Sequence, residues 1–173
     1  RFDAVTSQYG VEYLGIEAAA AAVAGHLTAG GRFLLLVHVT DSALVRPRRA
    51  DLEELEALLG IGPAADLEAW LAGELEPGAL EARTRAFLGR DLRRTRHLSG
   101  QVIRGVDQVL ELLESGQDGQ ARVLGGNLTL RVRAEQGRLQ QLLTAALNPD
   151  ELKCLMAGLG DQGLDCDPPR SLT

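Results

Sequence analysis

A near-continuous apolar run at residues 33–39 is the feature that most constrains the fold of this chain. The run follows a glycine pair, Gly30-Gly31, and this pattern is typical of a parallel strand covered on both faces. Residues 2–6 carry aromatic and β-branched side chains and predict an earlier strand. Between the two, the alanine-rich residues 14–28 predict a helix that ends at the glycines. Residues 1–40 therefore predict a β–α–β unit.

Residues 48–147 change to helical periodicity, with leucines and valines recurring three or four positions apart. Glycine and proline separate the successive helical series, for example at Gly62-Pro63 and Pro77-Gly78. The pair Gly125-Gly126 is open to two interpretations, a break in a helix or a short loop. Trp70 and Phe87 fall on the apolar stripes and are expected to anchor the core or a lid. The segment predicts a set of packed helices.

Residues 148–173 predict one more helix and the beginning of a strand. Asn148 is a suitable N-cap, and Pro149 suits the first helical position. The expected buried face consists of Leu152, Leu155, Met156 and Leu159, with Gly160 or Gly163 as the stop. Residues 164–167 could then begin a strand before Pro168-Pro169. The predicted fold class is α/β, with a partial sheet in residues 1–47, a large helical insertion in residues 48–147, and a last core segment in residues 148–173.

Charge and composition exclude several classes of protein. The chain has 18 Lys and Arg residues against 24 Asp and Glu residues, a net charge of −6, which disfavours a general nucleic-acid binder. Its apolar runs are far shorter than the roughly 20 residues that span a bilayer. Its two cysteines, without a C-x-x-C or Cys/His cluster, predict neither a disulfide scaffold nor a zinc site. No secretory signal is recognisable, so a cytoplasmic location is expected.

Residues 83–96 form a locally basic segment, with six arginines against one aspartate. Such a segment is more typical of a solvated helix face than of a patch for an acidic substrate or nucleic acid. We expect His97, beside these arginines, to belong to the same face, and His26 to lie on the surface at a helix end.

Two segments, FDAVTSQYGVEY at residues 2–13 and LTAGGRFLLLVH at residues 27–38, resemble class I S-adenosylmethionine-dependent methyltransferases. The resemblance implies a Rossmann-like fold, in which these segments correspond to the fourth strand, the following helix and the fifth strand of the family. It extends weakly to residues 148–167, as the last helix and the opening of the sixth strand. Residues 48–147 would then be an insertion that serves as a lid or as an oligomerisation surface, the latter in a homo-oligomer.

The family's glycine-rich turn after its first strand, and the acidic residue that ends its second strand, have no counterpart here. Gly30-Gly31 follows a helix and precedes a strand, which is the wrong order for a cofactor loop. The chain also begins with Arg1 instead of Met. We therefore expect it to be the carboxyl-terminal portion of a longer methyltransferase, to bind the methyl donor poorly by itself, and to leave a sheet edge and an apolar face unpaired.

The resemblance also implies where the site lies. Ser7, Gln8, Tyr9 and Gly10 correspond to the segment that passes the methionine portion of S-adenosylmethionine, although an ordinary loop in which Ser7 and Gln8 cap a helix is the alternative. Ligands in open α/β sheets bind at the carboxyl ends of the strands, which agrees with that placement. The implied reaction is an in-line displacement at the sulfonium methyl, which depends mainly on orientation.

Three further residues are candidates for contact with the methyl acceptor. Glu12 and Tyr13 would face it, although Glu12 could equally belong to a first helical turn. His38, the only imidazole at a strand end, could take a proton from the acceptor. The alternative for His38 is a structural histidine bonded to nearby backbone. Nothing in the sequence identifies the acceptor.

Two other functions stay open. Residues 48–147 could form a helical module for protein interactions, with residues 1–40 as its scaffold. The other interpretation is a fragment of a nicotinamide-dependent oxidoreductase. It is the less favoured one, because the chain contains no Tyr-x-x-x-Lys pair and its only lysine is Lys153.

Overall fold

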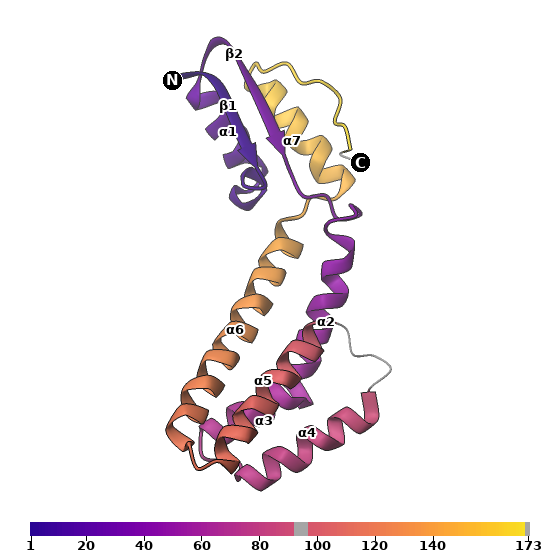
Figure 1. Ribbon diagram of the computed structural model, residues 1–173. Helices are drawn as coiled ribbons and strands as arrows, with labels where there is room; N and C mark the ends of the chain where they lie inside the picture. Colours follow the sequence, from indigo (N-terminus) through magenta and orange to yellow (C-terminus); the bar gives the residue numbers. More distant parts are fainter. Residues whose placement is uncertain (92–96, 172–173) are drawn as a thin grey trace. The chain divides into compact units, whose positions relative to one another are not determined.

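The computed structural model describes the backbone of residues 1–91 and 97–171, and the side chains of residues 1–87 and 98–171. Within these residues the chain is a mixed α/β protein with seven α-helices, one 3-10 helix and a two-stranded parallel sheet (Figure 1). It divides into two compact units. The α/β unit comprises Arg1–Pro47 and Gln141–Thr173, and the helical unit comprises Arg48–Gln140.

As far as the last helix, the elements follow the order that the sequence predicts. The α/β unit contains β1 (Phe2–Gln8), η1 (Val11–Leu14), α1 (Ile16–His26), β2 (Leu27–Leu36) and α7 (Pro149–Asp161). The other helices are α2 (Arg46–Ile61), α3 (Pro63–Leu71), α4 (Pro77–Asp91), α5 (His97–Glu114) and α6 (Asp118–Ala145). The second boundary between the units lies after Gln140, not after residue 147 as expected. The reason is that Leu142 and Ala146 pack with Val45 in the α/β unit.

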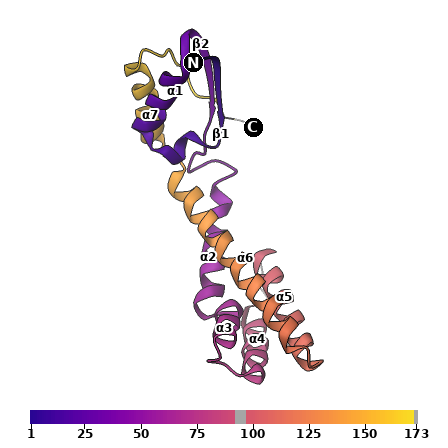
Figure 2. The same ribbon diagram turned by 90° about the vertical axis from the view of Figure 1, so that its left-hand side faces the viewer.

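The β–α–β unit is present, with β1 and β2 paired in parallel. Helices α1 and α7 lie on the same side of this sheet (Figure 2). Ala19 and Val23 of α1 share a core with Leu155 and Leu159 of α7, and Phe33 of β2 packs against it. The small side chains of α1 allow a close approach, since a Cβ on Gly158 of α7 would lie 3.5 Å from that of Ala20. The alanine run therefore serves the packing between helices as well as helix formation.

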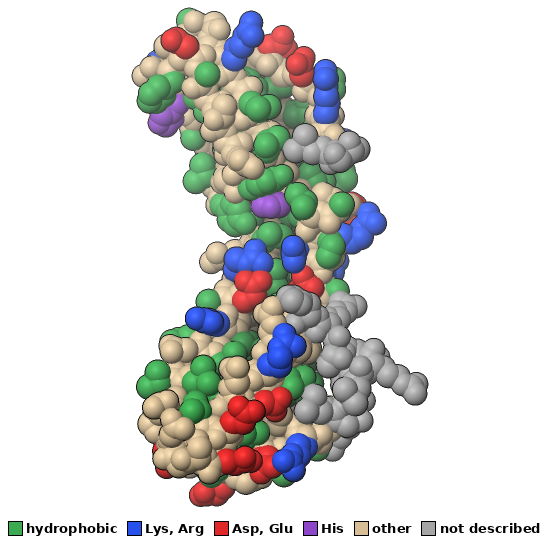
Figure 3. Space-filling view, in the orientation of Figure 1, with side chains coloured by type: hydrophobic (Ala, Val, Ile, Leu, Met, Phe, Trp, Pro, Cys, Tyr) green, Lys and Arg blue, Asp and Glu red, His purple; other side chains and the backbone are tan. Residues whose placement is uncertain are grey.

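The expectation that β2 is covered on both faces is wrong. Side chains alternate between the two faces of a strand, and only one face of this sheet is packed against helices. On the opposite face Leu34, aligned with Thr6, is 59% exposed. Hydrophobic side chains also reach the surface of the α/β unit in Figure 3. The apolar run encodes a strand, but its second apolar face has no cover among the described residues of this unit.

The glycine pair has a different role from the one expected. Helix α1 ends at His26, and Leu27 already belongs to β2 and pairs with Phe2. The register then shifts, so that Ala4 pairs with Arg32. Gly30 has a φ of 79°, and a Cβ on Gly31 would lie 3.2 Å from the carbonyl oxygen of Asp3. The glycines therefore form a bulge within β2 and do not end the helix.

The last helix begins as the sequence predicts. The side chain of Asn148 accepts hydrogen bonds from the backbone N–H groups of Asp150 and Glu151, and Glu151 bonds back to the Asn148 N–H. Leu155 and Leu159 are buried, and Leu152 packs against the same core. The predicted strand at residues 164–167 is absent from the described residues. Leu164 and Cys166 instead pack against the core as irregular chain.

The helical unit has its own hydrophobic core. Leu55, Leu58 and Leu139 lie in one cluster and Leu67 and Val106 in another. Trp70 is 3% exposed and Phe87 packs against the first cluster, so both are core residues as expected. Helix α6 continues through Gly125-Gly126 without a break. A Cβ on Gly125 would lie 3.3 Å from a methyl of Leu67, so glycine allows α6 to approach α3 closely.

The basic segment falls partly outside the described residues. Of its arginines, Arg83 pairs with Asp66 at 2.9 Å and Arg85 pairs with Glu81. The side chains of Arg90, Arg93, Arg94, Arg96 and His97 lie outside the described residues. The other histidine that the sequence places on the surface, His26, is exposed at the end of α1, as expected. Within the described ranges, no helix combines the length and the apolar character that crossing a membrane requires.

Candidate functional site

The candidate site lies where β1 and β2 end. Their carboxyl ends are adjacent because the strands are parallel, and Gln8 pairs with Leu36 in the last register position. The Tyr9 N–H donates to the Leu36 carbonyl at 2.7 Å. Tyr9 has a φ of 55°, an unusual value for a residue other than glycine, and this turns the chain away from the sheet into η1. The turn places Glu12 next to His38, which lies just beyond the end of β2.

Glu12 holds His38 through one carboxylate oxygen. The imidazole Nδ1 donates to Glu12 Oε1 at 2.8 Å, and the His38 backbone N–H donates to the same oxygen at 3.3 Å. The Glu12 side chain is fully buried. Its second oxygen, Oε2, is also buried and has no hydrogen-bond partner. A buried carboxylate that orients an imidazole is the arrangement that prepares a histidine for proton transfer, because it fixes which ring nitrogen carries the proton.

His38 has two further contacts, one through its ring and one through its backbone. The Tyr9 ring stacks on it, with centroids 4.4 Å apart and an interplanar angle of 28°. The His38 carbonyl accepts a hydrogen bond of 2.9 Å from the backbone N–H of Leu147. The imidazole remains 13% exposed, and its Nε2 has no hydrogen-bond partner among the described residues. Nε2 is therefore the ring atom left to accept a proton from a ligand.

The structure brings together some of the predicted residues and separates others. Tyr9, Glu12 and His38 form one cluster. Ser7 lies beside Gly10, where an added Cβ would come within 3.2 Å of the Ser7 Oγ. Gln8 and Gly10 are exposed at the same strand end. Tyr13 is 48% exposed and takes no part in the cluster.

Two of the alternative interpretations do not hold. Ser7 and Gln8 cap no helix, because Gly10 is the N-cap of η1 and Gly15 that of α1, neither with a side-chain cap. The ring of His38 bonds to a carboxylate and not to nearby backbone. Leu147, which anchors the His38 carbonyl, was not identified from the sequence. In the sequence, only its position next to the helix cap Asn148 could have pointed to Leu147.

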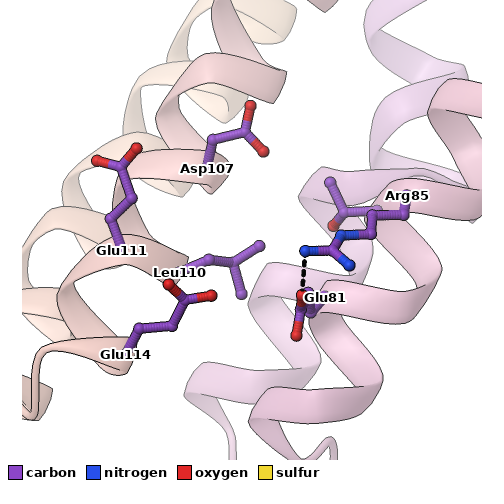
Figure 4. Close-up of a pocket in the computed structure, with 7 residues that line it drawn as sticks. Glu81, Arg85, Asp107, Leu110, Glu111 and Glu114 are labelled. Carbon is purple, nitrogen blue, oxygen red and sulfur yellow. Dashed lines mark ion pairs between the residues drawn. The ribbon is translucent and has the colours of Figure 1, made fainter.

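A pocket in the helical unit is another candidate site, and no sequence pattern pointed to it. It has a volume of about 250 Å³ and lies between α4 and α5. Asp107, Glu111 and Glu114 of α5 line it together with Arg85 of α4, which already pairs with Glu81 at 2.5 Å (Figure 4). The three carboxylates are exposed, so water screens them strongly. The buried Glu12–His38 pair is the better candidate for chemistry.

No metal centre is found among the described side chains, where no three His, Cys, Asp or Glu residues are grouped to hold an ion. No protein-family model, curated protein or solved structure matches this chain.

Proposed function

We propose that the α/β unit is the acceptor-side part of an S-adenosylmethionine-dependent methyltransferase with a Rossmann-like core, in which Glu12 and His38 remove the acceptor proton. The observation that carries this proposal is the hydrogen bond of 2.8 Å between the buried Glu12 carboxylate and His38 Nδ1. It lies at the carboxyl end of a parallel strand pair, where ligands bind in open α/β sheets. The segment resemblance at residues 2–13 and 27–38 supplies the reaction class.

The residues present are suited to the methyl donor. S-adenosylmethionine is cationic at sulfur, and the site offers a buried carboxylate with an unpaired oxygen and the face of the Tyr9 ring. Gly10 allows the chain to pass close to Ser7, because an added Cβ would lie only 3.2 Å from the Ser7 Oγ. Ser7, Gln8, Tyr9 and Gly10 would hold the methionine portion. The donor supplies a methyl group that the positive sulfur has already activated for displacement.

The chain's own residues would then manage the acceptor proton. His38 Nε2 accepts it, and the ring becomes an imidazolium. Glu12 stabilises that charge from the Nδ1 side, because charge-assisted hydrogen bonds are stronger than neutral ones. The stacked Tyr9 ring keeps the imidazole plane fixed, which preserves the direction of Nε2. The enzyme class proposed is therefore a transferase that uses a general base.

The test is a titration of the 173-residue chain with S-adenosylmethionine, followed by backbone amide NMR. We expect shifts confined to residues 7–10 and to His38, with weak affinity. Tyr9→Ala should reduce these shifts, whereas Leu44→Ala, at an exposed leucine of the same unit, should leave them unchanged. Absence of shifts at residues 7–10 with millimolar donor, or shifts spread equally over both units, would overturn the proposal.

The helical unit supports a second candidate function, a surface for association. Val123 and Leu130 of α6 are 67% and 70% exposed and lie seven positions apart, on one helix face. Large exposed apolar side chains on one stripe are typical of helices that meet a partner. Sedimentation of the wild-type chain and of a Val123→Lys, Leu130→Lys variant tests this. A concentration-dependent dimer that the variant loses supports a homo-oligomer, and a monomer at all concentrations contradicts it.

A further inference from the structure

Helix α6 lies at the front of the helical unit in Figure 2, and its outer face carries a stripe of uncharged residues. Val123 and Leu130 of this stripe are 67% and 70% exposed. Gly119 and Gly126 alternate with them, so the four residues follow one another at intervals of four, three and four positions. These intervals keep all four on one face of an α-helix, because they average close to 3.6 residues. We call these four residues the α6 stripe.

The two glycines form notches between the large side chains of the α6 stripe. No heavy atom of the described residues lies within 4 Å of a Cβ built on Gly119 or on Gly126. Packing within the helical unit explains Gly125, where a Cβ would lie 3.3 Å from a methyl of Leu67, but it does not explain these two. Glycine is unfavourable inside a helix compared with alanine. A second helix on this face would use the notches, because a missing side chain allows two helices to approach closely.

The two ends of the α6 stripe carry opposite charges. Asp118 directly precedes Gly119, and Arg131 directly follows Leu130. Both charged side chains are exposed, and neither has an ion-pair or hydrogen-bond partner in the part of the chain that the structure describes. They are 13 positions apart, about 20 Å along the helix, so they cannot pair with each other. A copy of α6 that runs in the opposite direction would place each of them beside the opposite charge.

We propose that α6 pairs with α6 of a second copy of this chain, in antiparallel orientation and centred on residues 118–131. The inference rests on the association surface given above as the second candidate function. Val123 then faces the partner's Gly126, and Leu130 faces the partner's Gly119. Large side chains therefore enter notches along the whole contact. The pairing is two-fold symmetric, so each of these contacts occurs twice.

The ion pairs explain why the partner is a second copy in this orientation. Asp118 faces the partner's Arg131 at one end of the contact, and the same pair recurs at the other end. A parallel pair would instead bring like charges together at both ends and would set glycine against glycine, which leaves a gap. Since the contact is only about 20 Å long, we expect a weak and reversible dimer.

The experiment is sedimentation of the full chain with reversed charges. Asp118→Arg and Arg131→Asp should each raise the dissociation constant of the dimer about tenfold, because two ion pairs become two repulsions. The double variant should return it close to the wild-type value, which is possible only if the two residues meet between copies. Arg104→Asp, at an exposed arginine of α5, changes the net charge as Arg131→Asp does and should leave the dimer unchanged.

Spin labels test the orientation independently of the charges. A label on a cysteine at the exposed Gln140, in a chain with Cys154→Ser and Cys166→Ser, should lie about 45 Å from its counterpart in the antiparallel dimer. In a parallel dimer the two labels would lie within about 20 Å of each other. Electron paramagnetic resonance measures this distance. If a charge-reversed variant does not fold, as judged by circular dichroism, the label distance decides.

The outcomes separate this inference from the association function on which it rests. A dimer that Val123→Lys, Leu130→Lys abolishes, but that the single reversals leave intact or the double variant does not restore, overturns the antiparallel pairing alone. A label distance within about 20 Å does the same. A chain that stays monomeric at all concentrations overturns both the pairing and the association function.

Discussion

The buried carboxylate of Glu12 binds His38 twice through one oxygen, at 2.8 Å to the imidazole Nδ1 and at 3.3 Å to the backbone N–H. The two residues lie 26 positions apart in the chain. Both are carried to the same edge by parallel strands, one on the turn after β1 and the other just beyond β2. This pairing fixes the position of the imidazole relative to the buried carboxylate.

The first prediction concerns the tautomer of His38. Because Nδ1 donates to Glu12, the neutral imidazole should carry its proton on Nδ1, and Glu12→Ala should shift the population toward the Nε2 form. Long-range proton–nitrogen NMR of the histidine rings measures this directly. His26, whose Nδ1 lies 2.7 Å from the Ala22 carbonyl, is the internal control and should not change. A His38 tautomer unaffected by Glu12→Ala would show that the bond does not orient the ring.

The second prediction concerns the uncovered face of the sheet. Leu34 is 59% exposed on a strand, so the folded chain should bind a hydrophobic dye. Leu34→Thr should reduce dye fluorescence while the far-ultraviolet circular dichroism stays the same. Leu44→Thr, at a 56% exposed leucine outside the sheet, should have a smaller effect. Equal effects of the two substitutions would mean that the sheet face is not the dye site.

The third prediction concerns the junction between α2 and α3. A Cβ on Gly62 would lie 2.8 Å from the Cα of Leu58, a backbone atom that cannot move aside easily. Gly62→Ala should therefore lower the free energy of unfolding by about 1–3 kcal/mol. Gly60→Ala, within α2 and with open space around it, should raise it by about 0.5–1 kcal/mol. Chemical denaturation of both variants measures the difference, and equal effects would contradict the junction geometry.

The fourth prediction concerns the pH dependence of thiol alkylation. Burial, together with the neighbouring carboxylates of Asp165 and Asp167, raises the pKa of the Cys166 thiol. A raised pKa leaves less thiolate at a given pH, so Cys166 should react with iodoacetamide more slowly than the exposed Cys154, and its rate should keep rising to higher pH. Mass spectrometry of Cys154→Ser and Cys166→Ser variants separates the two rates. As a control, denaturation should largely remove the difference in alkylation rate between the two thiols. Faster reaction at Cys166 than at Cys154 in the folded chain would contradict this local structure.

Much of the local structure could be predicted because it depends on neighbouring residues. The Asn148 cap with Glu151, and the β–α–β order of residues 1–40, follow from short-range patterns. The strand predicted at residues 164–167 was wrong because a strand needs a partner, and the described residues offer none there. The apolar run of β2 likewise could not reveal that Leu34 would stay exposed, since an apolar side chain does not specify what covers it.

For the candidate site, the sequence by itself determined which residues stand at the strand ends: Tyr9, Glu12 and His38 were each identified as candidates. It left Glu12 undecided between a ligand contact and a helical turn, and His38 between catalysis and a backbone bond. Only the tertiary structure decided that Glu12 is buried and bonded to His38, because that contact depends on the register of two parallel strands and on the Leu147 anchor. Local propensity acts over a few residues, whereas strand register is fixed by packing between segments far apart in the chain.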